Sequence, residues 1–224
     1  VILALIPAVN IYNLATCPIE HLVDEGEGLS AKALFKMPMF WIAILLMVCS
    51  GASEISMAQW ASAYAESALG LSKTIGDLMG PCLFAVAMGI CRTIYGKFGE
   101  KVELKKFMIG SGVLCVICYL LASLSANPVI SLIGCITCGF SVGIMWPGTI
   151  SISSKRFPTG GTVMFALLAM AGDLGGSIGP AIVGRVADYA GGDIRKGMGI
   201  GLIFPVMLVI GLILFNKQKI NKVT

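Results

Sequence analysis

Two acidic side chains lie in the middle of long apolar stretches, where an ionisable group is costly and is therefore a candidate for chemistry. Glu54 occurs in CSGASEISMAQW and Asp173 in LLAMAGDLGGSIGP. Gln59 and Trp60 follow Glu54 within two helical turns. Aromatic rings pack on the C–H faces of sugars while amides and carboxylates hydrogen-bond hydroxyl groups, so this mixture suits a polyhydroxylated solute. A carboxyl group in such a position can also relay protons.

The same residues have structural explanations. Each carboxylate could anchor a local hydrogen-bond network between helices, and the glycines around Asp173 favour packing there. Trp60 could be an aromatic residue of the membrane interface. Trp146, beside Pro147, lies deeper in its apolar stretch and is a candidate cavity or gate residue. Arg92 lies near the end of its stretch, where its side chain could extend to the interface.

Two cysteine pairs have C-x-x-C spacing, namely Cys115/Cys118 and Cys135/Cys138. This spacing permits a redox pair or a metal site. No histidine or carboxylate is near either pair in the sequence, and all four cysteines lie in apolar runs. We therefore interpret them as small apolar residues that face neighbouring helices, and we predict neither a metal site nor a cofactor.

The composition predicts an integral membrane protein. Of the 224 residues, 57% are hydrophobic and 12% are charged, and the charged share is half of the roughly 25% that soluble domains carry. The sequence has no HExxH zinc motif. Since no soluble nucleotide-binding domain is evident either, we predict neither an enzyme nor an ATP-driven pump.

Six apolar stretches are long enough to cross a bilayer, which takes roughly 20 residues. They are residues 38–64, 77–95, 107–125, 128–153, 162–187 and 197–216. We predict four parts: the end of a preceding transmembrane helix (1–16), a polar cytoplasmic linker that contains His21 (17–37), a six-helix transmembrane bundle (38–216) and a cytoplasmic tail (217–224). The apolar stretch 1–14 is too short to span and has no initiating methionine, so we expect the chain to begin within a longer protein.

The basic residues predict the orientation, because Lys and Arg accumulate on the cytoplasmic side. Of the 16, one set of alternate loops holds 12 and the other holds 4. The linker and the tail both belong to the basic set, so both are predicted to be cytoplasmic, and the membrane is predicted to be a bacterial plasma membrane.

Glycine pairs with GxxxG spacing predict tight helix packing, because small residues let backbones approach closely in lipid. Four of the six stretches contain such pairs: Gly76/Gly80, Gly139/Gly143, Gly172/Gly176, Gly175/Gly179 and Gly197/Gly201. Pro147 and Pro180 lie inside predicted helices and favour kinks.

Two stretches resemble the fucose–proton symporter-like branch of the major facilitator superfamily. The order Gly51, Glu54, Trp60 resembles that branch's seventh helix, and GFSVGIMWPGTISIS (139–153) resembles its tenth. The resemblance covers nearly the whole chain. It implies an all-α membrane protein whose six transmembrane helices form the C-terminal bundle of a twelve-helix major facilitator fold, with two inverted three-helix repeats.

Two further stretches resemble gating or packing motifs of the superfamily. Residues 92–101 resemble its basic inter-helix motif and retain Lys97 and Gly99, but Gly96 stands where the motif has Asp. The resemblance therefore implies no charge relay in this loop. Gly179–Pro180 resembles a Gly-Pro motif of antiporters, and we assign it to packing.

Together these observations predict a secondary active transporter that moves a small polar solute, with a sugar favoured, by proton-coupled alternating access. Its partners would be the solute, protons, the lipid bilayer and the missing N-terminal six-helix half; no nucleic acid is expected. The predicted substrate and proton site comprises Glu54, Gln59, Trp60, Trp146 and Asp173. A proton-coupled multidrug or organic-cation antiporter is the main alternative, and a non-transporting receptor or structural protein is a further one.

Overall fold

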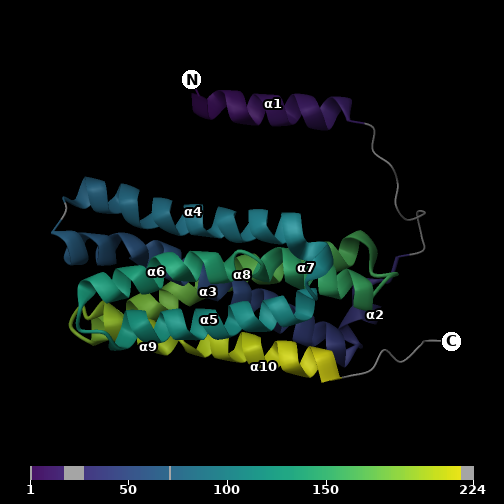
Figure 1. Cartoon of the computed structure of the whole chain (residues 1–224). Helices are drawn as coiled ribbons and strands as arrows, with labels where there is room; N and C mark the ends of the chain where they lie inside the picture. Colours follow the sequence, from purple (N-terminus) through teal and green to yellow (C-terminus); the bar gives the residue numbers. More distant parts are fainter. Residues whose placement is uncertain (1, 18–27, 71, 218–224) are drawn as a thin grey trace.

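The computed structural model describes residues 2–17, 28–70 and 72–217. His21 and most of the predicted tail lie outside these ranges. The described residues form helices and contain no strand. Six helical segments in this part of the chain are long and apolar enough to cross a membrane, and they lie side by side in one bundle (Figure 1). The predicted fold class is confirmed.

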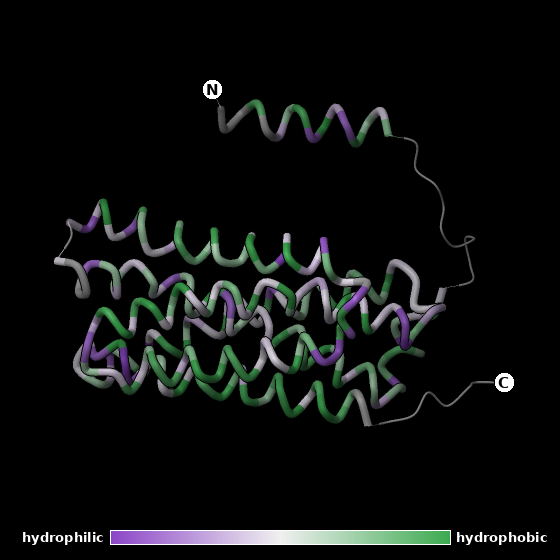
Figure 2. Tube along the Cα trace, in the orientation of Figure 1, coloured by the Kyte–Doolittle hydropathy of each residue, from purple (hydrophilic) through white to green (hydrophobic). Residues whose placement is uncertain are grey.

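The six spans are built from eight helices. Three spans are continuous: α3 (Pro38–Leu69), α4 (Lys73–Phe98) and α5 (Leu104–Leu124). The fourth consists of α6 (Pro128–Val142) and α7 (Met145–Arg156), the fifth is α8 (Gly161–Tyr189), and the sixth consists of α9 (Ile194–Gly201) and α10 (Ile203–Lys217). The tube in Figure 2 is hydrophobic along most of their length. Hydropathy therefore located all six spans.

Both broken spans share a sequence feature. Pro147 is the third residue of α7 and Pro205 is the third residue of α10. Each follows a glycine by four positions, Gly143 and Gly201 respectively. Proline has no backbone N–H, so the carbonyl four residues earlier loses its helical donor. The predicted kink at Pro147 thus takes the form of a break one turn earlier, whereas Pro180 lies within the continuous helix α8.

Most span boundaries differ from the prediction by a few residues. Helix α4 begins four residues earlier than expected, so Asp77, which accepts a hydrogen bond from Ser62 of α3, lies inside the helix. The predicted linker also contains a short helix, α2 (Ala31–Phe35), whose Leu34 is fully buried. An apolar side chain inside a polar segment anchors this part of the linker to the bundle. The N-terminal stretch forms α1 (Ile2–Thr16), with 15 residues.

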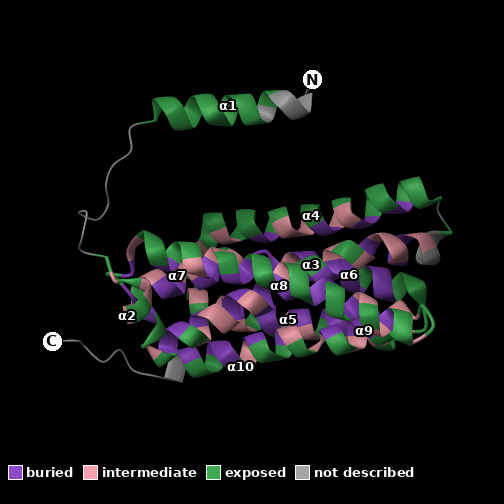
Figure 3. Ribbon diagram, turned by 180° about the vertical axis from the view of Figure 1, so that it is seen from behind, coloured by how far each residue is buried: buried purple, intermediate pink, exposed green. Residues whose placement is uncertain are grey.

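Helix α3 is central and α4 is peripheral. In the most apolar window of each span, 61% of the residues are buried in α3 and in α6–α7, against 22% in α4. Figure 3 shows the correspondingly large exposed surface of α4. Tyr119 of α5 is fully buried and donates a 2.9 Å hydrogen bond to the Ser53 carbonyl oxygen of α3. Glu54 therefore lies on one of the two most buried spans.

All five predicted glycine pairs lie at helix contacts. Gly76 and Gly80 pack on α3, Gly139 and Gly143 on α4, and Gly197 and Gly201 on α8. The other two pairs join α8 to α3. A methyl group added at Gly51 would lie 2.0 Å from the Gly172 carbonyl oxygen, and one at Gly175 would lie 2.0 Å from that of Val48. We refer to this contact of Gly51, Gly172, Gly175 and Gly179 as the α3–α8 seam.

Candidate substrate and proton site

Glu54 lies close to the middle of its span, 16 residues after Pro38 and 12 before Glu66. On a helix, it shares one face with Gly51 and Ala61. Gly51 packs on α8, and Ala61 packs on Gly80 of α4. Glu54 is therefore held between the contacts that α3 makes with α8 and with α4. Its side chain is half-buried, and Oε2 is buried with no hydrogen-bond partner among the described residues.

Trp146 reaches the same level of the bundle from α7. A methyl group at Gly172 would lie 2.3 Å from Cζ2 of Trp146, so the indole packs directly on the α8 backbone. Gly172 also contacts Gly51, one turn from Glu54. The absence of a side chain at Gly172 thus lets helices α3, α7 and α8 meet one turn from Glu54.

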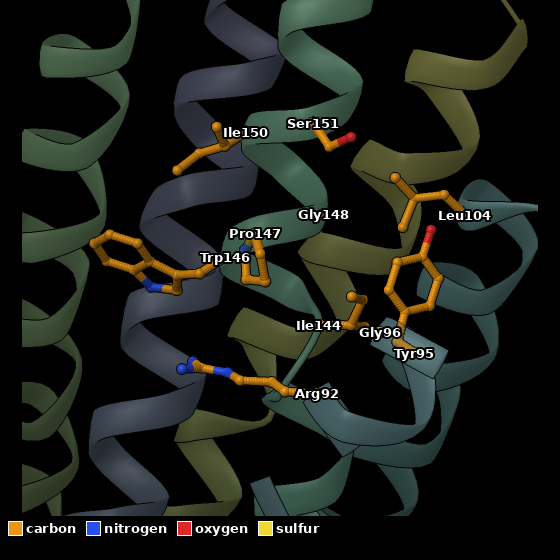
Figure 4. A pocket seen from close by; sticks show the side chains of 10 residues that line it. All are labelled: Arg92, Tyr95, Gly96, Leu104, Ile144, Trp146, Pro147, Gly148, Ile150 and Ser151. Carbon is orange, nitrogen blue, oxygen red and sulfur yellow. The ribbon is translucent and has the colours of Figure 1, made fainter. Parts of the chain in front are cut away.

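A cavity of about 580 Å³ opens beside Trp146. It is lined from α4, α5 and the α6–α7 break by residues that are mostly apolar or aromatic (Figure 4): Arg92, Tyr95, Gly96, Leu104, Ile144, Trp146, Pro147, Gly148, Ile150 and Ser151. This volume falls in the range of about 300–1,000 Å³ typical of small-molecule sites.

Arg92 takes a position that the sequence did not predict. Instead of extending along α4 to the membrane interface, its side chain crosses the cavity toward Trp146 and the α3 ribbon in Figure 4. Its Nε donates a 3.0 Å hydrogen bond to the Gly143 carbonyl oxygen. This is the carbonyl that Pro147 deprives of a donor. The guanidinium therefore compensates for the proline.

The other predicted site residues are more dispersed. Gln59 is exposed on α3. Trp60 is half-buried beside Gly184 of α8, and its Nε1 is buried with no hydrogen-bond partner among the described residues. Asp173 follows Gly172 but lies on the exposed side of α8. Its backbone carbonyl accepts a hydrogen bond from the Ser177 hydroxyl. The structure thus brings Trp146 near Glu54 and adds Arg92, while Gln59 and Asp173 face outward.

The predicted gating residues lie at the end of α4. Lys97 Nζ is 5.6 Å from the centroid of the neighbouring Phe98 ring. Gly99 packs closely on the ring of Tyr95, which stacks on Phe107 with centroids 5.3 Å apart. Gly96 is exposed and lines the cavity. These contacts are aromatic and local, and Gly96 supplies no acid for an ion pair.

The four C-x-x-C cysteines are buried and free. Cys115 Sγ of α5 is 3.8 Å from Cys138 Sγ of α6. Within the described ranges, no group of His, Cys, Asp and Glu side chains has the arrangement of a metal site. The cysteines thus fill the contact between two helices.

Gly139–Gly143 also has the G-x-S-x-G spacing of a hydrolase nucleophile, a match that our sequence reasoning missed. Such a serine stands on a sharp turn between a strand and a helix. Here Ser141 is fully buried inside α6, and its Oγ donates a 2.7 Å hydrogen bond to the Cys138 carbonyl oxygen. The spacing reflects close packing of α6 on α4.

The fold is a bundle of six helices long and apolar enough to span a membrane, and sequence comparison gives the family. The model of the Major Facilitator Superfamily matches residues 7–180, which is more than half of the chain. The chain belongs to this superfamily. Comparison with curated proteins gave no match.

Two solved structures have the same fold. One is the Major Facilitator Superfamily transporter FucP in the outward conformation, and the other is a single-residue variant of the E. coli fucose:proton symporter FucP. Each has a TM-score of 0.78 and 17% sequence identity, and the alignment covers 96% of this chain and 53% of FucP. The chain thus spans about half the length of FucP. At this identity the likeness concerns the fold.

Proposed function

We propose that the chain is one bundle of a secondary active transporter that moves a small polar solute together with protons, and that a second six-helix bundle completes it. The coverage of about half of FucP supports a two-bundle assembly. The solute would be a sugar or a sugar-like compound, because FucP is a fucose:proton symporter. The bundle end that carries most of the basic loop residues would face the cytoplasm of a bacterial cell.

The observation that carries the proposal is the carboxylate of Glu54. It lies at the middle of a membrane span, and one of its oxygens is buried without a hydrogen-bond partner among the described residues. A buried carboxylate without a partner is costly, so its retention is better explained by a proton that it binds and releases. Trp146 and Arg92, which line the cavity, would contact the solute.

The alternative of an organic-cation antiporter has one supporting feature, the aromatic lining that Tyr95 and Trp146 give the cavity. The charge of Arg92 opposes it, because a guanidinium repels a cationic ligand in the same cavity.

The test is proton movement in membrane vesicles that contain this chain together with its partner bundle. Internal pH is followed while a panel of sugars, sugar derivatives and lipophilic cations is added. We expect one solute class to drive proton entry, and Glu54→Gln to abolish it. Glu66→Gln is the matched control, since Glu66 lies on the same helix three turns nearer its end, and it should retain proton entry. Unchanged proton entry in Glu54→Gln would refute the role of Glu54.

A further inference from the structure

Arg92 has unused hydrogen-bonding capacity inside the cavity. Its Nε is engaged with the Gly143 carbonyl. Within the described ranges, no hydrogen bond to its two terminal nitrogens and no ion pair to its guanidinium is present. A guanidinium presents its donors in a planar fork that matches the two oxygens of a carboxylate. The structure therefore leaves an anion-binding group facing an open space.

The rest of the cavity suits the body of a small organic acid. Arg92 is the charged residue among the ten that line it, and none of the ten is acidic. Tyr95 and Trp146 provide aromatic faces, and Ser151 provides a hydroxyl group. Such a lining can pack on the carbon skeleton of a ligand while Arg92 holds its charge.

We propose that the transported solute is a small organic carboxylate, such as a sugar acid, whose carboxylate binds the terminal nitrogens of Arg92. This inference rests on the proposed function, since it names the solute class of the same site. It replaces a neutral sugar by an acidic one and leaves the proton-binding role of Glu54 in place.

Charge balance explains how the proton and the anion would be coupled. In the empty site, ionised Glu54 and Arg92 sum to zero. When the carboxyl oxygen of Glu54 binds a proton and a solute carboxylate binds Arg92, the sum is again zero. Binding of only one leaves a net charge, which is unfavourable inside the membrane. The neutral states reorient readily, so proton and anion travel together.

The neighbouring helices bring few other charges to this level. On α4, Asp77 lies fifteen positions before Arg92, near the opposite end of the helix. Asp173 of α8 lies on the exposed side of that helix. The charged residues of α7 are Lys155 and Arg156, in its last turn, and α6 has none. Lys97 of α4 lies five positions after Arg92, and Lys105 and Lys106 of α5 follow the lining residue Leu104, with Lys106 paired to Glu103. Away from these helix ends, the charge balance depends on Glu54 and Arg92.

The experiment compares two pairs of probes that differ by a carboxylate: D-glucuronate with D-glucose, and D-gluconate with D-glucitol. Proton entry is measured in vesicles containing this chain and its partner bundle. We expect at least one acid to drive proton entry and its neutral counterpart not to do so. Arg92→Gln should lower the rate by about ten-fold or more, while Arg92→Lys, which keeps the charge, should lose less. Arg185→Gln, at an exposed arginine of α8, is the matched control and should behave as wild type.

Two further measurements separate binding from folding. Because the loaded site is neutral, clamping the membrane potential with valinomycin and potassium should leave the acid-driven rate unchanged, whereas symport of a neutral sugar would respond. Pro147→Ala gives the Gly143 carbonyl a backbone donor again, so Arg92→Gln in that background should remain folded and still lose acid-driven proton entry.

The outcomes are distinct. Proton entry driven by a neutral probe and unaffected by Arg92→Gln would overturn the inference but leave the proposed function standing. Absence of acid-driven entry with both pairs would also overturn it, and the proposed function would then be judged by the wider panel and Glu54→Gln. Acid-driven entry that is lost in Arg92→Gln but retained in Glu54→Gln would sustain the anion site and refute the proton site.

Discussion

The hydrogen bond between Arg92 and Gly143 can be tested by removing either the donor or the reason for it. Arg92→Met deletes the donor while keeping an unbranched side chain. Pro147→Ala restores a backbone N–H that can reach the Gly143 carbonyl. The geometry allows this, because Gly143 and Ile144 have right-handed helical dihedral angles and the next bond in the ladder, from Gly148 N to the Ile144 oxygen, is formed at 2.8 Å.

The expected magnitude follows from the type of bond. Hydrogen bonds between membrane helices contribute about 0.6 kcal/mol on average and up to about 1.7, and bonds to charged groups are at the upper end of such ranges. We expect Arg92→Met to lower the free energy of unfolding by about 1.5 kcal/mol, roughly ten-fold in the equilibrium constant. In the Pro147→Ala background the loss should fall to about 0.5 kcal/mol or less, because the carbonyl already has a donor.

The assay is unfolding of the purified chain in mixed micelles by increasing SDS, followed by far-ultraviolet circular dichroism. Arg185→Met, at an exposed arginine of α8, controls for the loss of a positive charge and should change stability little. Equal losses for Arg92→Met in the wild-type and Pro147→Ala backgrounds would refute the argument, since Arg92 would then stabilise the bundle by some route other than the carbonyl freed by the proline.

Three further outcomes follow from packing. Gly175→Ala should lower the free energy of unfolding by about 1–3 kcal/mol, because its methyl group would meet the Val48 carbonyl. The control Gly89→Ala has open space around the new methyl group and should be neutral or slightly stabilising. Equal SDS unfolding midpoints for the two variants would contradict this. Tyr119→Phe should cost about 0.6–1.7 kcal/mol through the lost bond to the Ser53 carbonyl, and an unchanged unfolding midpoint would show that the bond contributes nothing. A maleimide should label at most the two exposed cysteines of the eight in the folded protein, because buried thiols are inaccessible, and all eight after denaturation. Mass spectrometry counts the labelled sites, and rapid labelling of a third cysteine would contradict the burial. The buried cysteines are Cys49, Cys91, Cys115, Cys118, Cys135 and Cys138.

The sequence alone predicts the features that lipid imposes on every membrane protein. A spanning helix needs a long apolar stretch, so hydropathy locates all six spans. Close helix packing in lipid needs small residues, so the spacing of Gly172 and Gly175 indicates a helix contact. The unusual position of Glu54 is likewise visible, because a carboxylate in an apolar stretch is costly wherever the helix packs.

Features that depend on which helices become neighbours could not be read from local patterns. Asp77 looks like a charged helix end until Ser62 is found beside it. Arg92 looks like an interfacial side chain, because its acceptor is a backbone carbonyl 51 residues away. The usable signal was Pro147, since a proline inside a span predicts a carbonyl in need of a donor. The sequence does not say which helix supplies that donor.

The α3–α8 seam limits how the bundle can move. Sliding one helix along the other by one turn, about 5.4 Å, would bring the side chain of Val48 or Ile55 against the Gly172 carbonyl that now faces Gly51. We therefore expect these two helices to translate and rotate as a single rigid body that carries Glu54. The conformational change of a transport cycle would then occur in the two interrupted spans, where α7 and α10 would pivot at the glycine–proline breaks. In that case the cavity that Arg92 faces would change shape at α7, while Glu54 moves only with the rigid pair α3 and α8.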